Sequence, residues 1–212
     1  MRISKDRQTR CAELEDAALA LFLKKGYETA MVSDIVQTVG VAQGTFYYYF
    51  KTKEDMLDAV LVRLLQEGVT RAARLAADQT QPALQRLEGL FRMLFSPRGS
   101  IDANSQYSQF LTDPAVHTRM EEVRFHMLVP VIKALVDAGV ALGEIKPIRY
   151  SDELTEIALQ GASAFMHSRK AMMQEAMSAD ATLDALAEFM ERLLGLADGR
   201  LDFKDKVIRR HN

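Results

Sequence analysis

Hydrophobic residues recur along this chain at steps of three and four, which is the spacing of one face of an α-helix. Leu14, Ala18, Leu21 and Phe22 form the first such stripe, and Gly26 then stands where a helix would end. Strand signals are nearly absent, because apolar and polar residues do not alternate for more than about four positions. The pattern therefore predicts an all-α protein.

The same periodicity places the later helices. Two short helices are expected at 32–39, ending at Gly40, and at 42–50. They are followed by longer ones at 54–77, 82–95 and 114–139, and by two closing helices with stripes at 154–165 and 183–197. Pro130 lies inside one of these patterns and predicts a kink there. Residues 201–212 have a mixed-charge composition and are expected to form a tail.

Composition excludes several classes of protein. With 48% hydrophobic and 26% charged residues, the chain is an ordinary globular protein. Its single cysteine, Cys11, excludes a disulfide framework and a cysteine-rich zinc site. His117, His126 and His167 lack the spacing of a helical metal-binding pair, so neither a metal nor another cofactor is expected.

No membrane segment is expected either. The longest apolar run, Ala17 to Leu23, has seven residues, whereas a helix needs about 20 to cross a bilayer. The basic start of the chain does not lead into a signal-peptide pattern. We therefore expect a soluble, cytoplasmic protein.

Charge is distributed unevenly behind a formal net charge of −2. Residues 1–53 carry eight Lys and Arg against six Asp and Glu, while the remainder carries 19 against 23. The excess lies at the front, where Arg2, Lys5, Arg7 and Arg10 face only Asp6. A short basic arm suits phosphate neutralisation, and an ordinary solvated terminus explains it equally well.

Residues 32–50 predict a helix-turn-helix, since two short helices are joined by a tight turn at Gly40. In this motif the second helix enters the DNA major groove by its N-terminal residues. That end offers Gln43 to pair with adenine and Thr45 to reach a phosphate or a thymine methyl group. Gly44 between them would let the backbone come close to the duplex.

Three consecutive tyrosines, Tyr47 to Tyr49, follow on the same helix. Successive side chains on a helix point about 100° apart, so the three cannot all be buried. At least one is expected to present its ring and hydroxyl to solvent or to a ligand. Lys53 and the first amides of the next helix, beside Glu54, are expected to clamp a phosphate.

From Ala18 to Leu57 the sequence resembles the DNA-binding head of the TetR family of bacterial repressors. The matching positions are, in order, Ala18, Leu21, Phe22, Gly26, Tyr27, Val32, Asp34, Ile35, Gly40, Val41, Gly44, Thr45, Tyr47, Phe50, Lys53 and Glu54. So many elements in the right order and spacing are far more specific than a helix-turn-helix pattern alone. The all-helical remainder has a length that suits the ligand-binding and dimerisation domain of this family.

The resemblance implies a role for individual residues. The positions implied to contact DNA are Ser33, Gln43, Gly44, Thr45, Tyr47, Tyr48, Tyr49 and Lys53, with Tyr47 and Lys53 mostly on phosphates. Phe46 and Phe50 match buried anchors of the recognition helix. The implied domains are a helix-turn-helix domain at 1–53, an effector-binding and dimerisation domain at 54–200, and the tail.

Some positions depart from the family pattern. Ala30 and Ala42 stand where the family usually has a capping threonine or serine, and each lost cap costs about 0.5–2 kcal/mol of helix stability. Thr29 is expected to substitute for the first. Val36 and Val39 replace the usual alanines, which implies slightly different packing. DNA binding is still expected with these departures, but the exact base preference does not follow from the sequence.

An effector pocket and a dimer interface are expected in the body. Pro130 leaves the carbonyl of His126 without its helical donor, and the kink either borders a pocket or merely shapes the helix around the core. The residues expected around the pocket are Phe91, Phe95, Tyr107, Phe110, Met127 and Phe165. The residues expected at the dimer interface are Leu154, Ala158, Gly161, Ala162, Leu183, Leu186, Met190 and Leu193, in a four-helix bundle across a two-fold axis.

The family mechanism completes this interpretation. A small-molecule effector would move the long helix after Lys53, change the spacing of the two recognition helices in the homodimer, and release a palindromic double-stranded operator. Common enzyme motifs are absent from the sequence, so no catalytic residues are expected. The alternative is a helical module that binds small molecules or proteins and has kept its helix-turn-helix without a DNA function.

Overall fold

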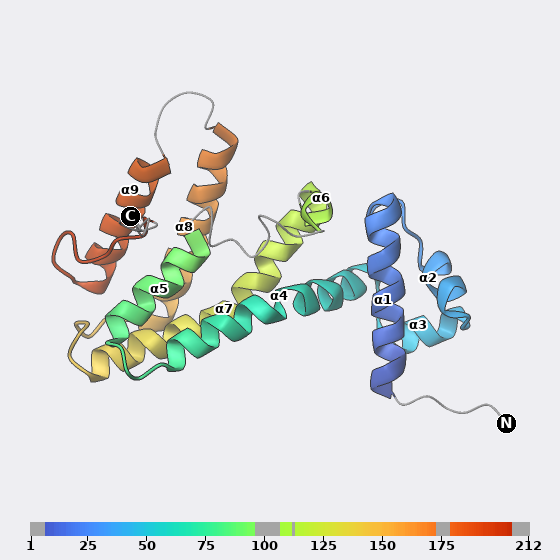
Figure 1. The fold of residues 1–212 in the computed structure, drawn as a ribbon, viewed down its shortest axis with the longest axis horizontal. Helices are drawn as coiled ribbons and strands as arrows, with labels where there is room; N and C mark the ends of the chain where they lie inside the picture. The colour runs from blue at the N-terminus through green and yellow to red at the C-terminus, as the bar shows by residue number, and fades with distance from the viewer. Residues whose placement is uncertain (1–6, 96–106, 112, 173–178, 205–212) are drawn as a thin grey trace, which may run out of the picture. The chain divides into compact units, whose positions relative to one another are not determined.

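The computed structural model describes residues 7–95, 107–111, 113–172 and 179–204, and this part of the chain contains nine helices and no strand (Figure 1). The helices are α1 (Arg7–Lys25), α2 (Val32–Val39), α3 (Gln43–Tyr49), α4 (Lys53–Ala77), α5 (Ala83–Phe95), α6 (Ser108–Leu111), α7 (Pro114–Ala141), α8 (Ser151–Met172) and α9 (Ala179–Leu194). The prediction of an all-α fold is confirmed.

The predicted ends of the first helices agree with the structure to within about one residue. Helix α1 stops before Gly26, whose φ is +82°, and α2 stops before Gly40, whose φ is +72°. Both angles lie in the left-handed region, where glycine has no steric penalty. The turns after these two helices therefore depend on their glycines.

The chain divides into two compact units. The head unit contains the described residues up to Glu67 and those within 104–124, and the body unit contains those within 68–103 and those from Phe125 onward. Helices α4 and α7 each contribute to both units. Because compactness divides the chain inside these helices, the functional boundary expected at residue 53 stays a prediction.

The head unit has its own small core. Helix α1 packs on α2, and α2 packs on α3. Leu14, Phe22, Ile35 and Phe46 are essentially inaccessible to solvent. Phe110 of α6 stacks on Phe22, with ring centroids 6.1 Å apart, so α6 also contributes to this core.

The body unit encloses a larger core from α5, α7, α8, α9 and the segment after α9. Its most deeply buried side chains are Leu87, Leu90, Ile132, Val136, Met190 and Phe203. Helices α8 and α9 pack on each other. The expected stripe along α9 faces inward, whereas that along α8 does so only in part, because Ala158 and Ala162 are buried and Ile157 is 64% exposed.

The first residues of the expected tail belong to this core, so that prediction is wrong for 201–204. Leu201 and Phe203 are only 5% and 1% exposed. The Arg92 guanidinium donates to the Asp202 carbonyl oxygen at 2.7 Å. The buried Glu191 carboxylate accepts the Leu201 amide at 2.6 Å. A segment of three alternating residues is too short to register as a periodic pattern, which is why the sequence did not reveal it; residues 205–212 lie outside the described part.

Two other features of the fold concern α6 and Pro130. The four-residue helix α6 was not predicted, because one turn has no period to detect. Helix α7 continues through Pro130, whose ring is exposed. An exposed ring favours the simpler interpretation, in which the proline only shapes the helix. The kink itself stays a prediction.

Candidate nucleic-acid interface

Helix α3 is held in place from its inner side. Phe46 is 0% exposed and Phe50 is 7% exposed, and they pack against a head core that includes Ile35 and Val36. The ring centroids of Phe46 and Phe50 lie 5.7 Å apart. The prediction that these two phenylalanines are buried anchors is confirmed.

The outer side of α3 carries the side chains expected at DNA. Tyr47 is 51% exposed and Tyr48 is 70% exposed, whereas Tyr49 is half-buried with its ring edge-on to Tyr48 at 5.0 Å. Gln43 and Gly44 are exposed at the start of the helix. The expectation that the tyrosine run must expose at least one ring is confirmed. Seven residues of helix thus present a polar and aromatic face supported by two buried rings.

Thr45 and Ser33 complete the expected set. Thr45 is half-buried and its amide donates to the Ala42 carbonyl at 2.8 Å, which starts the first turn of α3. Ser33 is exposed in the first turn of α2. Ala42 makes no side-chain cap, as expected from its type. The structure therefore leaves the start of α3 without a side chain covering its amides.

Gly44 has no internal role in the head. A Cβ atom added there would meet no atom within 4 Å, and its backbone is not in the left-handed region. Gly40 also has open space, but its positive φ requires a glycine. Of the two glycines, only Gly44 lacks a conformational reason within the chain.

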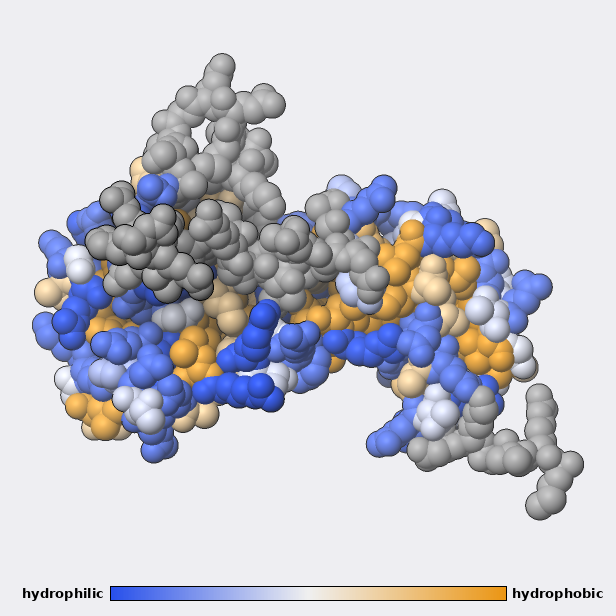
Figure 2. Space-filling view, viewed as in Figure 1, coloured by the Kyte–Doolittle hydropathy of each residue, from blue (hydrophilic) through white to orange (hydrophobic). Residues whose placement is uncertain are grey.

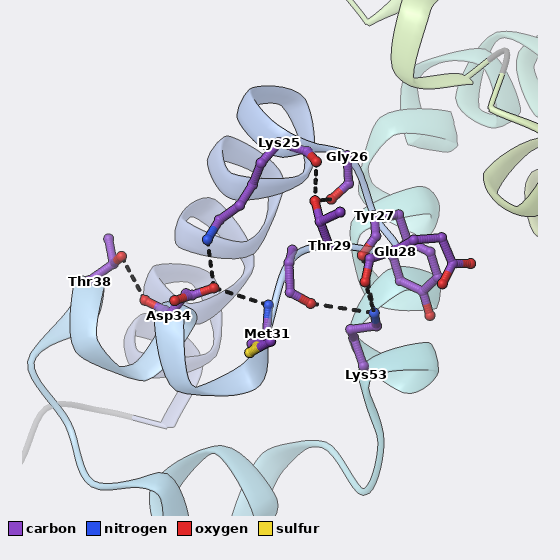
Figure 3. A network of polar contacts seen from close by, with 10 residues as sticks. Lys25, Gly26, Tyr27, Glu28, Thr29, Met31, Asp34, Thr38 and Lys53 are labelled. Atoms are coloured by element: carbon purple, nitrogen blue, oxygen red, sulfur yellow. Dashed lines mark hydrogen bonds and ion pairs between the residues drawn. The ribbon is translucent and has the colours of Figure 1, made fainter.

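The start of α2 is capped by a network that the sequence did not predict (Figure 3). The Asp34 carboxylate accepts the Met31 amide at 3.1 Å and the Lys25 ammonium at 2.7 Å. The hydrogen bond from Lys25, followed by that from the Met31 amide, lowers the pKa of Asp34. Asp34 therefore caps α2 and ties it to the end of α1. Its carboxylate also borders a surface depression of about 420 Å³.

Thr29 does not substitute for the missing cap at Ala30, so that expectation is wrong. Its hydroxyl instead donates backward to the carbonyl oxygen of Lys25, at the end of α1 (Figure 3). The N-cap position of α2 belongs to Met31. The Met31 amide finds its partner three residues ahead, in the pattern of a capping box whose acidic half is Asp34.

One amide in the first turn of α4, that of Asp55, and the two amides just before the helix, those of Lys51 and Thr52, are also occupied. The Asp55 carboxylate accepts the amides of Lys51 at 2.9 Å and Thr52 at 3.2 Å, and the Thr52 hydroxyl accepts the Asp55 amide at 3.0 Å. Thr52 and Asp55 thus form a reciprocal cap. A phosphate clamp made of these amides would compete with Asp55.

Lys53 makes contacts that differ from the expectation. Its ammonium donates to the carbonyl oxygens of Tyr27 at 3.1 Å, Glu28 at 3.2 Å and Ala30 at 3.4 Å (Figure 3). It also lies 4.4 Å from the centroid of the Tyr27 ring. Burial, and secondarily the charge of Glu54, raises the pKa of Tyr27 to about 12. Lys53 therefore connects α4 to the loop between α1 and α2.

The residues expected around an effector are distributed over both units. Phe91 and Phe95 are buried in the body core, where each ring lies within 6.4 Å of the Phe203 ring centroid. Met127 and Phe165 are half-buried in the same unit. Tyr107 and Phe110 belong to the head unit. Within the expected set, the structure shows a ring contact between Phe91 and Phe95, and both rings pack on Phe203 in the core of the body unit.

Most of the residues expected at a dimer interface serve the core of a single chain. Those with less than a tenth of their surface exposed are Ala158, Ala162, Leu183, Leu186 and Met190. Leu154 and Leu193 are half-buried, and Gly161 is exposed. Periodicity shows that one face of a helix is apolar, but it does not show whether that face packs inside the chain or against a second chain. Here the apolar faces of α8 and α9 pack largely inside the chain. The large hydrophobic side chains exposed on these helices are instead Ile157 (64%) and Phe189 (47%).

The described residues were also searched for a membrane-spanning helix and for a cluster of metal ligands. No described helix is long and apolar enough to cross a membrane. Among the same residues, no three His, Cys, Asp or Glu side chains gather as they would around a metal ion. Figure 2 shows hydrophobic residues interspersed with hydrophilic ones on the face in view.

Comparison with known proteins identifies the type of head. Residues 14–60 match the sequence model of the family described as bacterial regulatory proteins, tetR family. The transcriptional repressor KstR2 of Mycobacterium tuberculosis is 34% identical over 94 residues, which cover 44% of this chain and 46% of KstR2. The chain thus matches about half the length of that relative. The transcriptional regulator YfiR of Bacillus subtilis is 26% identical over 68% of this chain and 71% of YfiR.

Solved structures share the fold over most of the chain. RolR in complex with resorcinol has a TM-score of 0.60 and 22% identity, covering 91% of this chain and 90% of RolR. The FadR repressor of Thermus thermophilus in complex with lauroyl-CoA has a TM-score of 0.60 and 19% identity, covering 85% of this chain and 93% of FadR. The likeness therefore extends from the helix-turn-helix through the helical body.

Proposed function

We propose that this chain is a transcriptional repressor of the TetR family of bacterial regulatory proteins and that it binds a palindromic operator as a homodimer. The observation that carries the proposal is the face of α3: Gln43, Gly44 and two tyrosines are exposed there while Phe46 and Phe50 hold the helix from behind. A short helix with this division is suited to enter a major groove.

The proposed DNA contacts follow this face. Gln43 reads a base edge, Thr45 contacts a phosphate or a thymine methyl group, and Tyr47 contacts a phosphate through its hydroxyl. Tyr48 and Tyr49 lie further along α3, and Ser33 approaches from the first turn of α2. Gly44 allows the backbone to come close to the duplex. No catalytic role is part of the proposal.

The proposed dimer interface uses the exposed faces of α8 and α9. Ile157 and Phe189 are the large hydrophobic side chains exposed on these helices, and Gly161, one turn after Ile157, has open space where a partner helix can approach. A self-complementary patch of this kind suits a two-fold axis. Replacing Ile157 with Arg should shift the protein to monomers in sedimentation, whereas the same change at the exposed Leu142 should not.

The proposed effector is a small molecule bound by the body unit. The structural neighbours named above were solved with resorcinol and with lauroyl-CoA, which are chemically unlike each other. Four of the expected pocket residues, Phe91, Phe95, Met127 and Phe165, belong to this unit. Coupling of about 1–3 kcal/mol between effector and operator would weaken DNA binding about 5- to 150-fold.

The first test is binding to duplex DNA. Fluorescence anisotropy should be measured in salt steps with DNA from around the protein's own gene and with duplexes selected from a random pool. We expect affinity that falls steeply with salt, because Lys and Arg release counterions from phosphates. Tyr47→Ala removes a hydrogen bond to a charged phosphate and should weaken binding to every duplex by about 1.5–3 kcal/mol, or about 10- to 150-fold.

Tyr150→Ala is the matched control, since Tyr150 is a similarly exposed tyrosine in the body unit, at 60%. It should leave DNA binding unchanged. If neither source of DNA yields a duplex that wild type binds better than a scrambled one, the repressor proposal is wrong. A helical module that binds small molecules or proteins would then be the better description.

A further inference from the structure

We propose that Lys53 acts in DNA binding as a positioning residue that fixes the helix-turn-helix, and that it does not neutralise a phosphate. The inference rests on the proposed function, because it concerns how the same interface is held. It starts from the three hydrogen bonds of the Lys53 ammonium to the carbonyl oxygens of Tyr27, Glu28 and Ala30 (Figure 3).

These contacts use the whole donor capacity of the side chain. A lysine ammonium has three hydrogen atoms and no acceptor, and each hydrogen atom has a carbonyl partner here. The Tyr27 ring lies 4.4 Å from the nitrogen and adds a cation–π contact. A phosphate oxygen could bond to Lys53 only if one of these carbonyl groups lost its donor.

The Tyr27 ring is itself fixed. Tyr27 is 6% exposed, and Phe22 meets it edge-on with ring centroids 5.3 Å apart. Like any tyrosine, Tyr27 is neutral near pH 7, and burial raises its pKa further, to about 12, so it offers its ring rather than a negative charge. Lys53 is therefore held on a rigid platform, unlike a lysine that reaches freely into solvent.

The partners of Lys53 lie at the other end of the DNA-binding segment. Ala30 comes just before α2 and Lys53 is the first residue of α4, 23 positions later, so α2 and α3 both lie between them. A contact that joins the two ends of a segment reduces the conformations open to what lies between. Lys53 thus closes the helix-turn-helix, and the orientation of α3 depends on this closure.

Lys51 provides the matched comparison. It stands two residues earlier and is exposed, whereas Lys53 is half-buried. If a lysine in this stretch neutralises a phosphate, Lys51 has the open position for it. Replacing each lysine with Met removes the same charge and keeps a side chain of similar length.

The experiment compares wild type, Lys53→Met and Lys51→Met on the best duplex from the selection above and on a scrambled duplex, with the active fraction determined by titration. We expect Lys53→Met to weaken binding to the selected duplex roughly tenfold. Binding to the scrambled duplex and the salt slope should both stay as in wild type. A specificity loss of this kind is what a misplaced recognition helix produces.

Two outcomes would overturn the inference. A salt slope reduced by about 0.9, with both duplexes weakened equally, would make Lys53 a phosphate contact. An unchanged affinity per active molecule, with only a lower active fraction, would leave it a merely stabilising residue.

Hydrogen exchange measured without DNA separates this inference from the proposed function. Lys53→Met should speed exchange of the amides in α2 and α3 several-fold while leaving those in the middle of α1 unchanged. If wild type binds no duplex but this pattern appears, the repressor proposal fails and the closure by Lys53 stands. Unchanged exchange in α2 and α3 would contradict the closure whatever the DNA result.

Discussion

The head and the body use aromatic residues in opposite ways. On α3, Tyr47 and Tyr48 are more than half exposed, whereas Phe91, Phe95 and Phe203 of the body unit are buried against one another. Helix α3 has only seven residues, and its inner side is already filled by Phe46 and Phe50. Further aromatic residues on a helix therefore indicate a binding surface only where other side chains already fill its buried face. In the body, the same residue class fills a core.

The largest expected effect is that of Phe203→Ala on the unfolding free energy, which tests whether the aromatic residues of the body form its core. Removing a buried phenylalanine costs about 3–5 kcal/mol of unfolding free energy, and the 1% exposed Phe203 ring contacts two other phenylalanines. Urea unfolding should show this loss, while the folded fraction binds DNA as wild type does. Leu142→Ala, at a 63% exposed site, should change stability by no more than about 0.5 kcal/mol. A loss below 1 kcal/mol for Phe203→Ala would mean that the segment after α9 is a tail after all.

Glu191→Gln tests the polar part of the same segment. The Glu191 side chain is 3% exposed, and its carboxylate accepts the amides of Leu201 and Gly199 at 2.6 and 3.0 Å. A glutamine keeps one acceptor oxygen and puts an NH₂ group opposite a donor, so a loss of about 1–3 kcal/mol is expected in the same unfolding experiment. Glu188→Gln is the control, because Glu188 pairs with Arg192 at the surface. Equal effects of the two changes would contradict a buried role for Glu191.

Sequence periodicity placed the end of α1 and both ends of α2 and α3 almost to the residue, because short stripes ended by Gly26 and Gly40 leave little choice. It could not tell which neighbour a stripe packs against. Ala158, Ala162 and Met190 have the spacing of an interface, and they lie in the core of one chain. Ile157 has the same spacing and yet is 64% exposed, whereas Phe189 lies outside the stripe, so periodicity did not identify either side chain as exposed.

Polar contacts between distant positions were equally invisible in the sequence. The bonds from Lys53 to the loop before α2 span 23 to 26 positions, and no local pattern marks such a pair. The positions proposed to face DNA came from the helix-turn-helix pattern and the family motif, which encodes a shared surface. In the body no such motif is available, so core residues and interface residues were both predicted from helical periodicity, which does not distinguish them.

Gly44→Ala and Gly40→Ala distinguish a glycine needed for DNA binding from a glycine needed for the stability of the head. Gly40→Ala forces alanine into a left-handed conformation and should cost about 1–2 kcal/mol of stability. Gly44→Ala has open space in an exposed helix and should stabilise the head by up to about 1 kcal/mol. Only Gly44→Ala should weaken DNA binding per folded molecule, since its methyl group meets the duplex. Unchanged affinity would show that the backbone of α3 does not approach DNA at this point.

The smallest expected effect concerns the exposed cap at Asp34. Hydrogen bonds from Lys25 and the Met31 amide lower its pKa in the folded protein. A carboxyl group with a lowered pKa stabilises the fold above its unfolded pKa of about 3.9, and this contribution is lost as the pH falls through the lower folded value. Asp34→Asn should therefore destabilise the head slightly at pH 7 and less at lower pH.

Thermal unfolding of wild type and Asp34→Asn between pH 3 and pH 7 measures this difference. Lys25→Met removes the main partner of Asp34 and should reproduce much of the effect, so the double variant should fall short of the sum of the two single changes. A difference that stays constant with pH would mean that the shape of the side chain, rather than its charge, holds α2.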